Sequence, residues 1–132
     1  MSVWKDIVTE LRELIEEAIQ YKESEKELYA TLFEDVWIES DEEWREYYHD
    51  EIPYALKEIF KELGLSCRLY HKKDDVPGPE YVANCVNRAG RKIALGLDID
   101  YDYDAAEVVL MFASAYRDAE WTPNQLVYYH ET

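Results

Sequence analysis

The spacing of apolar residues changes near Gly64, and this change limits the folds that the chain can adopt. Before Gly64, apolar residues recur at steps of three and four, which is typical of amphipathic helices. After Gly64, apolar and polar residues alternate in short runs, which is typical of half-buried strands. A chain of 132 residues has the length of one domain. We therefore predict a single domain over 1–132, helical over 1–63 and β-rich over 64–132.

Helix signals fill the first half of the chain. The stretch 2–22 carries one apolar stripe and predicts the first helix. A serine followed three residues later by a glutamate, the capping-box pattern, predicts two further helix starts: Ser24 with Glu27, and Ser40 with Glu43. Pro53 should either kink the third helix or occupy the first turn of a fourth, which Gly64 would end. Three or four helices are expected.

The second half predicts a small mixed sheet. The expected strands are 66–72, 81–87, 91–103 and 125–130. The second and third of these are expected to form a hairpin. Asp104 with Glu107 resembles another capping box and predicts a helix over 105–120. N-terminal helices followed by strand-strand-strand-helix-strand make an α+β fold, with α/β as the alternative.

Charge is the most unusual part of the composition. The chain has 30 acidic and 14 basic residues, a net charge of -16, and four tryptophans that argue against disorder. Such a surface repels nucleic acid and anionic membranes, whose recognition depends on Lys and Arg. It attracts a basic protein and speeds that encounter. The alternative explanation is that the charge only keeps the protein soluble.

The remaining composition points to an ordinary cytoplasmic protein. Cys67 and Cys85 are too few for a disulfide scaffold and are most simply buried small apolar residues. The charged N-terminal stretch does not resemble a signal peptide, and no apolar run of about 18 residues could span a bilayer. Nucleotide-binding glycine motifs and the GxSxG nucleophile motif are absent from the sequence. We expect no membrane association.

Four aspartates alternate with apolar residues in the stretch LDIDYDYD, and we call them the aspartate ladder: Asp98, Asp100, Asp102 and Asp104. Strand residues two apart lie on one face at about 6.6 Å spacing. The ladder is therefore either the solvated side of a strand or a cluster that attracts a cation. A helix-loop-helix calcium site is excluded, because Tyr103 replaces the required glycine and Val109 the bidentate glutamate.

The predicted order of elements over roughly 53–130 is similar to the core of the restriction-endonuclease-like family. That resemblance implies a divalent-metal nuclease, or an inactive relative, that binds Mg or Mn. Asp98 and Asp100 match the third-strand positions of the catalytic motif, although the second strand has asparagine where an acid is expected. Glu58 or Glu62, on the preceding helix, could complete a metal site with Asp98 and Asp100, and Glu58 is the first candidate.

The stretch DEIPYALKEIFKELGL resembles a segment of phage anti-restriction proteins that mimic DNA. The matching positions combine an acid with a helix that starts at a proline: Asp50, Ile52, Pro53, Glu58, Ile59 and Phe60. The resemblance implies a compact acidic inhibitor of defence enzymes, in a family whose members are often dimeric.

Our leading hypothesis is a non-enzymatic inhibitor or immunity-type protein without a cofactor. It would bind a basic protein, a nucleic-acid enzyme above all, and not nucleic acid itself. Rigid carboxylates would replace phosphates against Arg and Lys of that partner. The residues expected to bind the partner are Glu13, Glu17, Glu42, Glu43, Glu46, Asp98, Asp100 and Asp102.

Overall fold

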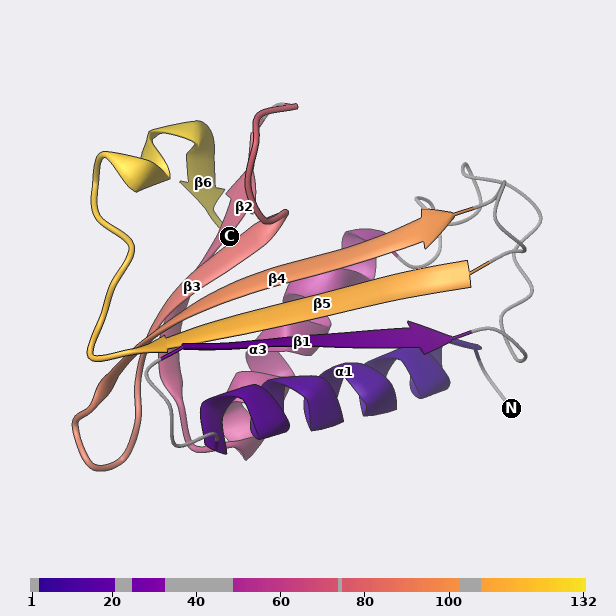
Figure 1. Ribbon diagram of the computed structural model, residues 1–132, viewed down its shortest axis with the longest axis horizontal. Helices are drawn as coiled ribbons and strands as arrows, with labels where there is room; N and C mark the ends of the chain where they lie inside the picture. Colours follow the sequence, from indigo (N-terminus) through magenta and orange to yellow (C-terminus); the bar gives the residue numbers. More distant parts are fainter. Residues whose placement is uncertain (1–2, 21–24, 33–48, 74, 103–107) are drawn as a thin grey trace.

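The computed structural model describes residues 3–20, 25–32, 49–73, 75–102 and 108–132 (Figure 1). The first half contains α1 (Val3–Gln20), β1 (Glu25–Leu32), the 3-10 helix η1 (His49–Glu51) and α3 (Ile52–Glu62). The second half contains β2 (Ser66–Lys72), β3 (Tyr81–Val86), β4 (Lys92–Asp102), β5 (Val108–Arg117), the 3-10 helix η2 (Gln125–Tyr128) and β6 (Tyr129–Glu131).

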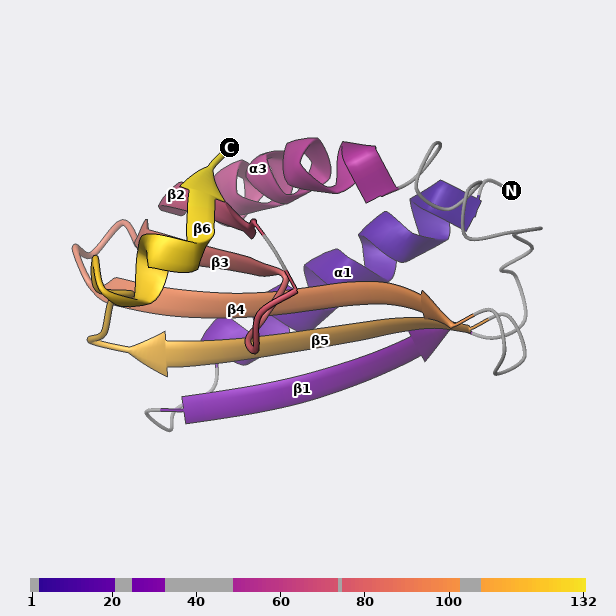
Figure 2. The same cartoon turned by 90° about the horizontal axis from the view of Figure 1, so that it is seen from above.

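The strands form one antiparallel sheet, and the helices cover one of its faces. The strand order is β1-β5-β4-β3-β2-β6, and every pair of neighbours is antiparallel. Figure 2 shows α1 and α3 together on one side of this sheet. We call these two helices, with η1, the helix layer, and the opposite side of the sheet the outer face. The protein is therefore of the α+β class, as predicted.

The core lies between the sheet and the helix layer. Leu95 and Leu97 of β4 are fully buried there, together with Ile15 of α1 and Leu56 of α3. Burying side chains of this size stabilises a fold by about 1.5–3 kcal/mol each. Because strand side chains alternate, Asp98 and Asp100 of β4 cannot share this face. The apolar side of β4 thus places these two aspartates on the outer face.

Helix α3 begins and ends where the sequence predicted. Pro53 lies in its first turn, where the missing backbone N–H costs nothing. Gly64 follows the helix with φ 73°, a left-handed conformation that suits glycine, and its N–H donates to the carbonyl of Lys61. The Leu65 N–H donates to the carbonyl of Phe60, which completes the helix end. The chain then turns directly into β2.

The helix predicted over 105–120 is wrong. Residues 108–117 form β5, which pairs with β4 from Ile93↔Arg117 to Asp102↔Val108. Most of this segment is apolar, so helical and strand periods fit it almost equally well. The segment lies between β1 and β4 in the sheet and is hydrogen-bonded to both, and these bonds favour the strand over the helix. The order strand-strand-strand-helix-strand and the mixed sheet are therefore both incorrect.

The helix predicted to start at Ser24 is also wrong over its described part. Residues 25–32 form β1, which pairs with β5 from Glu25↔Tyr116 to Leu32↔Val109. Its sequence EKELYATL is rich in good helix formers. Eight register pairs with β5 override that weak local preference. The predicted helical part of the chain thus contributes a strand to the sheet.

The two cysteines are bonded to each other. Cys67 and Cys85 lie opposite each other in the β2–β3 register and form a disulfide. The prediction that they are merely packed apolar residues is wrong, because the sequence did not show that the two strands pair in this register. Disulfides persist mainly in oxidising compartments. Cytoplasmic localisation stays a prediction that the disulfide does not favour.

Candidate functional site

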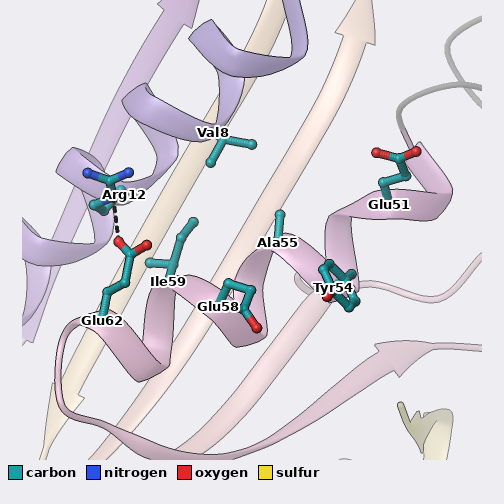
Figure 3. A pocket seen from close by; sticks show the side chains of 8 residues that line it. All are labelled: Val8, Arg12, Glu51, Tyr54, Ala55, Glu58, Ile59 and Glu62. Carbon is teal, nitrogen blue, oxygen red and sulfur yellow. Dashed lines mark ion pairs between the residues drawn. The ribbon is translucent and has the colours of Figure 1, made fainter.

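A groove of about 510 Å³ runs between α1 and α3 on the side of the helix layer that faces away from the sheet (Figure 3). It is lined by Val8 and Arg12 of α1, and by Glu51, Tyr54, Ala55, Glu58, Ile59 and Glu62 of η1 and α3. Its α3 residues are spaced by three and four, so they form one continuous side of that helix. The 3.6-residue period of the helix therefore places these side chains along one side of the groove.

The inner part of the groove is apolar. Ile59 and Ala55 are buried and form its base, and half-buried Val8 faces them from α1. Tyr54 stands at the edge with 73% of its surface exposed. An exposed aromatic beside an apolar depression is typical of a protein-binding surface.

The rim of the groove is acidic. Glu51, Glu58 and Glu62 are all exposed. Arg12 Nε lies 3.0 Å from Glu62 Oε2, and Figure 3 shows this ion pair closing one end of the groove. That Nε atom is shielded from solvent without a well-aligned hydrogen bond, so the contact is chiefly one of charge. Glu51 and Glu58 form no ion pair with any described residue, and they remain available to a cation.

Among the described residues, the excess of acidic over basic residues is largest on the helix layer. Its residues include nine acids and four bases: Asp6, Glu10, Glu13, Glu16, Glu17, Asp50, Glu51, Glu58 and Glu62 against Lys5, Arg12, Lys57 and Lys61. The six strands are nearly neutral, with Glu25, Glu27, Asp98, Asp100, Asp102 and Glu131 against Lys26, Arg68, Lys72, Lys92 and Arg117. Among the described elements, the excess of negative charge therefore lies on the helices rather than on the strands.

Asp98 has a structural role on the outer face. Its Oδ1 accepts a hydrogen bond of 2.7 Å from the backbone N–H of Glu80, just before β3 begins. Burial raises the pKa of Asp98 above its ordinary value, and the hydrogen bond and the charge of Lys72 offset only part of this effect. Asp98 therefore fastens the loop before β3 onto β4.

The same loop is held by a cluster of polar side chains at the β2 end. Glu80 Oε1 lies 2.8 Å from His71 Nε2, and Glu80 Oε2 lies 3.7 Å from Lys72 Nζ. The hydroxyl of Tyr129 donates to the carbonyl of Pro79 at 2.7 Å. Burial, with the charges of Asp98 and Glu80, raises the pKa of this tyrosine. These contacts tie β2, β4 and the C-terminal strand together.

The segment around Trp121 and the loop before β3 both cover part of the outer face. Asn84 holds the backbone of Trp121 through its side-chain oxygen and nitrogen, at 2.6 and 3.0 Å, and the indole of Trp121 donates to the carbonyl of Leu95. The loop before β3 packs closely on β4 at Gly96. A Cβ added there would lie only 3.1 Å from Pro79 Cγ and 2.7 Å from Ser114 Oγ, so this position has no room for a side chain. The asparagine at the second-strand position of the suspected nuclease motif thus anchors a loop.

The predicted partner-binding residues lie on both sides of the sheet. Glu13 and Glu17 are exposed on α1, whereas Asp98 is half-buried and Asp100 exposed on the outer face. The others lie outside the described residues or have undescribed side chains: Glu42, Glu43, Glu46 and Asp102. The groove residues Val8, Arg12 and Glu51 were not predicted as binding residues. Tyr54 is a different case, because a tyrosine outside the apolar stripe of its helix and close to other tyrosines is typical of a protein-binding surface.

The carboxylates of the alternative metal site do not come together. Glu58 lines the groove in the helix layer, whereas Asp98 and Asp100 lie on the outer face beyond the core. Within the described part of the chain, no group of three His, Cys, Asp or Glu side chains is placed to hold a metal ion.

Comparison with protein-family models, curated proteins and solved structures gives no match for this chain. Among the helices that the structure describes, none has both the length and the apolar character needed to cross a membrane. The functional proposal therefore depends on the geometry and charge of the helix layer.

Proposed function

We propose that this protein is a non-enzymatic inhibitor or immunity-type protein that binds a basic partner through its helix layer. The observation that carries this proposal is the excess of nine acids over four bases on that layer, which also contains an apolar groove lined by three of these acids. Opposite charge would speed the encounter, and the apolar groove would supply contact area once the partners meet.

We further propose that the partner is a protein that handles nucleic acid. Such proteins present Lys and Arg to phosphates, and exposed carboxylates can occupy the same basic residues. Carboxylates at successive turns of a helix lie about 5–6 Å apart at their Cβ atoms, which provides a regular row of charge. In this view the protein competes with nucleic acid for one surface, as a DNA mimic with an anti-restriction or related anti-defence role would.

The helix layer, rather than the aspartate ladder, is the proposed contact. A partner that rests on Glu13 and Glu17 would have to extend around the sheet to reach Asp100. Asp98 already accepts the Glu80 N–H and is only half exposed. Among the described residues nothing favours the nuclease alternative, because the sheet and core separate Glu58 from both aspartates.

A capture experiment tests this proposal. The immobilised full chain is exposed to lysate at low salt, and bound proteins are eluted between about 0.05 and 0.5 M salt. Proteins that bind as proposed should elute over this range, and duplex DNA or RNA should displace them. The variant Glu13→Gln/Glu17→Gln/Glu58→Gln should lose this capture.

The matched control also removes three exposed acids, but from outside the helix layer: Asp75→Asn, Asp100→Asn and Glu120→Gln. It should retain capture. Binding that ignores salt and nucleic acid, or that the control loses as completely as the helix variant, would refute the proposal.

A further inference from the structure

We propose that the groove between α1 and α3 docks one amphipathic, basic α-helix of the partner. This inference rests on the proposed function and specifies where and how the partner binds. The incoming helix would place apolar side chains on Tyr54, Ala55 and Ile59, and lysines or arginines over Glu51 and Glu58.

The length of the groove along η1 and α3 corresponds to about three turns of a helix. Its α3 side extends from Glu51 to Glu62, which corresponds to roughly 16 Å at 1.5 Å per residue. Its other side is another helix, and Figure 3 shows Val8 of α1 pointing toward Ala55 and Ile59 of α3 across the groove. A third helix in this groove would extend the helix layer in the way that helix-in-groove complexes do.

The apolar residues of the groove provide an anchor for such a helix. Ile59 and Ala55 form a buried base, and Val8 provides the opposite wall. Tyr54 is the most exposed of the large hydrophobic residues described, so a partner could cover much of its ring. Tyrosines in this setting are frequent hot spots of protein interfaces.

The acidic rim of the groove favours a partner helix with positive charge. Glu51 and Glu58 are seven residues apart, which places them two turns apart on the same side of the α3 region. Lysines or arginines seven residues apart on the incoming helix could meet both. Arg12 is already neutralised by Glu62 at 3.0 Å, so it does not cancel the two other glutamates.

Two synthetic peptides test the inference against the full-length protein by fluorescence anisotropy. The first, of about 18 residues so that it can be helical, carries leucine at helical spacing and lysine on the flanks. The second has the same composition in an order without an apolar stripe. We expect the first to bind at least about tenfold more tightly.

Four single variants locate the binding. Tyr54→Ser and Glu58→Gln should each weaken binding of the amphipathic peptide about threefold or more. Tyr128→Ser, at another exposed tyrosine, and Asp75→Asn, at an exposed acid outside the helix layer and the groove, should leave it unchanged. All four positions are exposed, and amide NMR spectra would report both intact folding and the peptide-induced shifts on α1 and α3.

The outcomes separate this inference from the proposed function. Equal, salt-sensitive binding of both peptides would overturn the groove and leave a general acidic binding surface. A preference for the amphipathic peptide that Tyr54→Ser and Glu58→Gln do not change would also overturn the groove. Failure of both peptides to bind at low salt would count against the groove and the proposed function together.

Discussion

The helix layer and the outer face of the sheet both carry acids, but they use them differently. On η1 and α3, Glu51 and Glu58 are exposed beside an apolar groove and form no ion pair with a described residue. On β4, Asp98 accepts a backbone hydrogen bond from Glu80 and is partly buried by the segments around it. An acid that the fold already uses is a poor candidate for partner binding. The comparison therefore favours the helices, although the aspartate ladder is the more conspicuous pattern in the sequence.

The ladder itself is not uniform. Asp98 and Asp100 share one face of β4, yet Asp98 is half-buried and Asp100 is exposed. The loop before β3, with Pro79 close to Gly96, covers this face near Asp98. The exposure of each aspartate on a strand can therefore be told only when the segment that covers the strand is known.

The largest expected effect tests the core that joins the helix layer to the sheet. Leu95→Ala removes a fully buried side chain and should lower the free energy of unfolding by about 2–5 kcal/mol. Denaturant unfolding measures this loss. Exposed Glu58→Gln is the matched change on the binding side and should alter stability by no more than about 0.5 kcal/mol. A loss below about 1 kcal/mol at Leu95 would contradict the described core.

The second largest effect is expected for the disulfide, which links β2 and β3 of the sheet and lies outside the helix layer. Reduction of Cys67–Cys85, which closes a sequence separation of 18, should cost about 3 kcal/mol of unfolding free energy. Unfolding curves with and without reductant measure it, and thiol labelling reports the bond itself. The variant Cys67→Ala/Cys85→Ala should unfold identically in both conditions. Free thiols in the oxidised protein would disprove the pairing.

Two substitutions at Asp98 distinguish the effect of its hydrogen bond on stability from the effect of its charge. Asp98→Ala leaves the Glu80 N–H without its acceptor and should cost about 1–3 kcal/mol. Asp98→Asn keeps an acceptor oxygen and removes a partly buried charge, so it should cost much less. Thermal or denaturant unfolding of the two variants makes the comparison. Equal losses in both would mean that the negative charge, rather than the hydrogen bond, holds the loop.

The ionisation of Asp98 should also contribute to the pH dependence of the free energy of unfolding. Because burial raises the pKa of Asp98 above 3.8, the folded state favours its protonated form. The contribution of Asp98 to stability is therefore greatest below pH 3.8 and declines as the pH rises through the raised pKa. Subtracting the pH profile of Asp98→Asn from that of the parent isolates this decline. An NMR titration that gives Asp98 a pKa below 3.8 would refute it.

The smallest effect is expected within the helix layer itself. Arg12 and Glu62 form an ion pair in which both side chains are about half exposed, so the solvent screens it. A double-mutant cycle of Arg12→Gln and Glu62→Gln should give a coupling of about 0–1 kcal/mol. A clearly larger value would mean that this pair positions α1 against α3, rather than only balancing charge in the groove.

Much of the fold could be predicted from local patterns. The apolar stripes of α1 and α3, Pro53 and Gly64 at the ends of α3, and the β3–β4 hairpin all follow from residues close in sequence. The two wrong helices are β1 and β5, which pair with each other across a long sequence separation. Their local preferences were weak or ambiguous, and pairing outweighed them. The disulfide was missed for the same reason, since it depends on register.

By itself, the sequence determined that this chain is acidic, that its first segment is an amphipathic helix, and that alternating strands follow Gly64, because charge and hydrophobic period are local properties. Only the tertiary structure decided which acids remain available to a partner. That depends on which loop covers Asp98 and on how α1 lies beside α3, and both arise from contacts between residues distant in the chain.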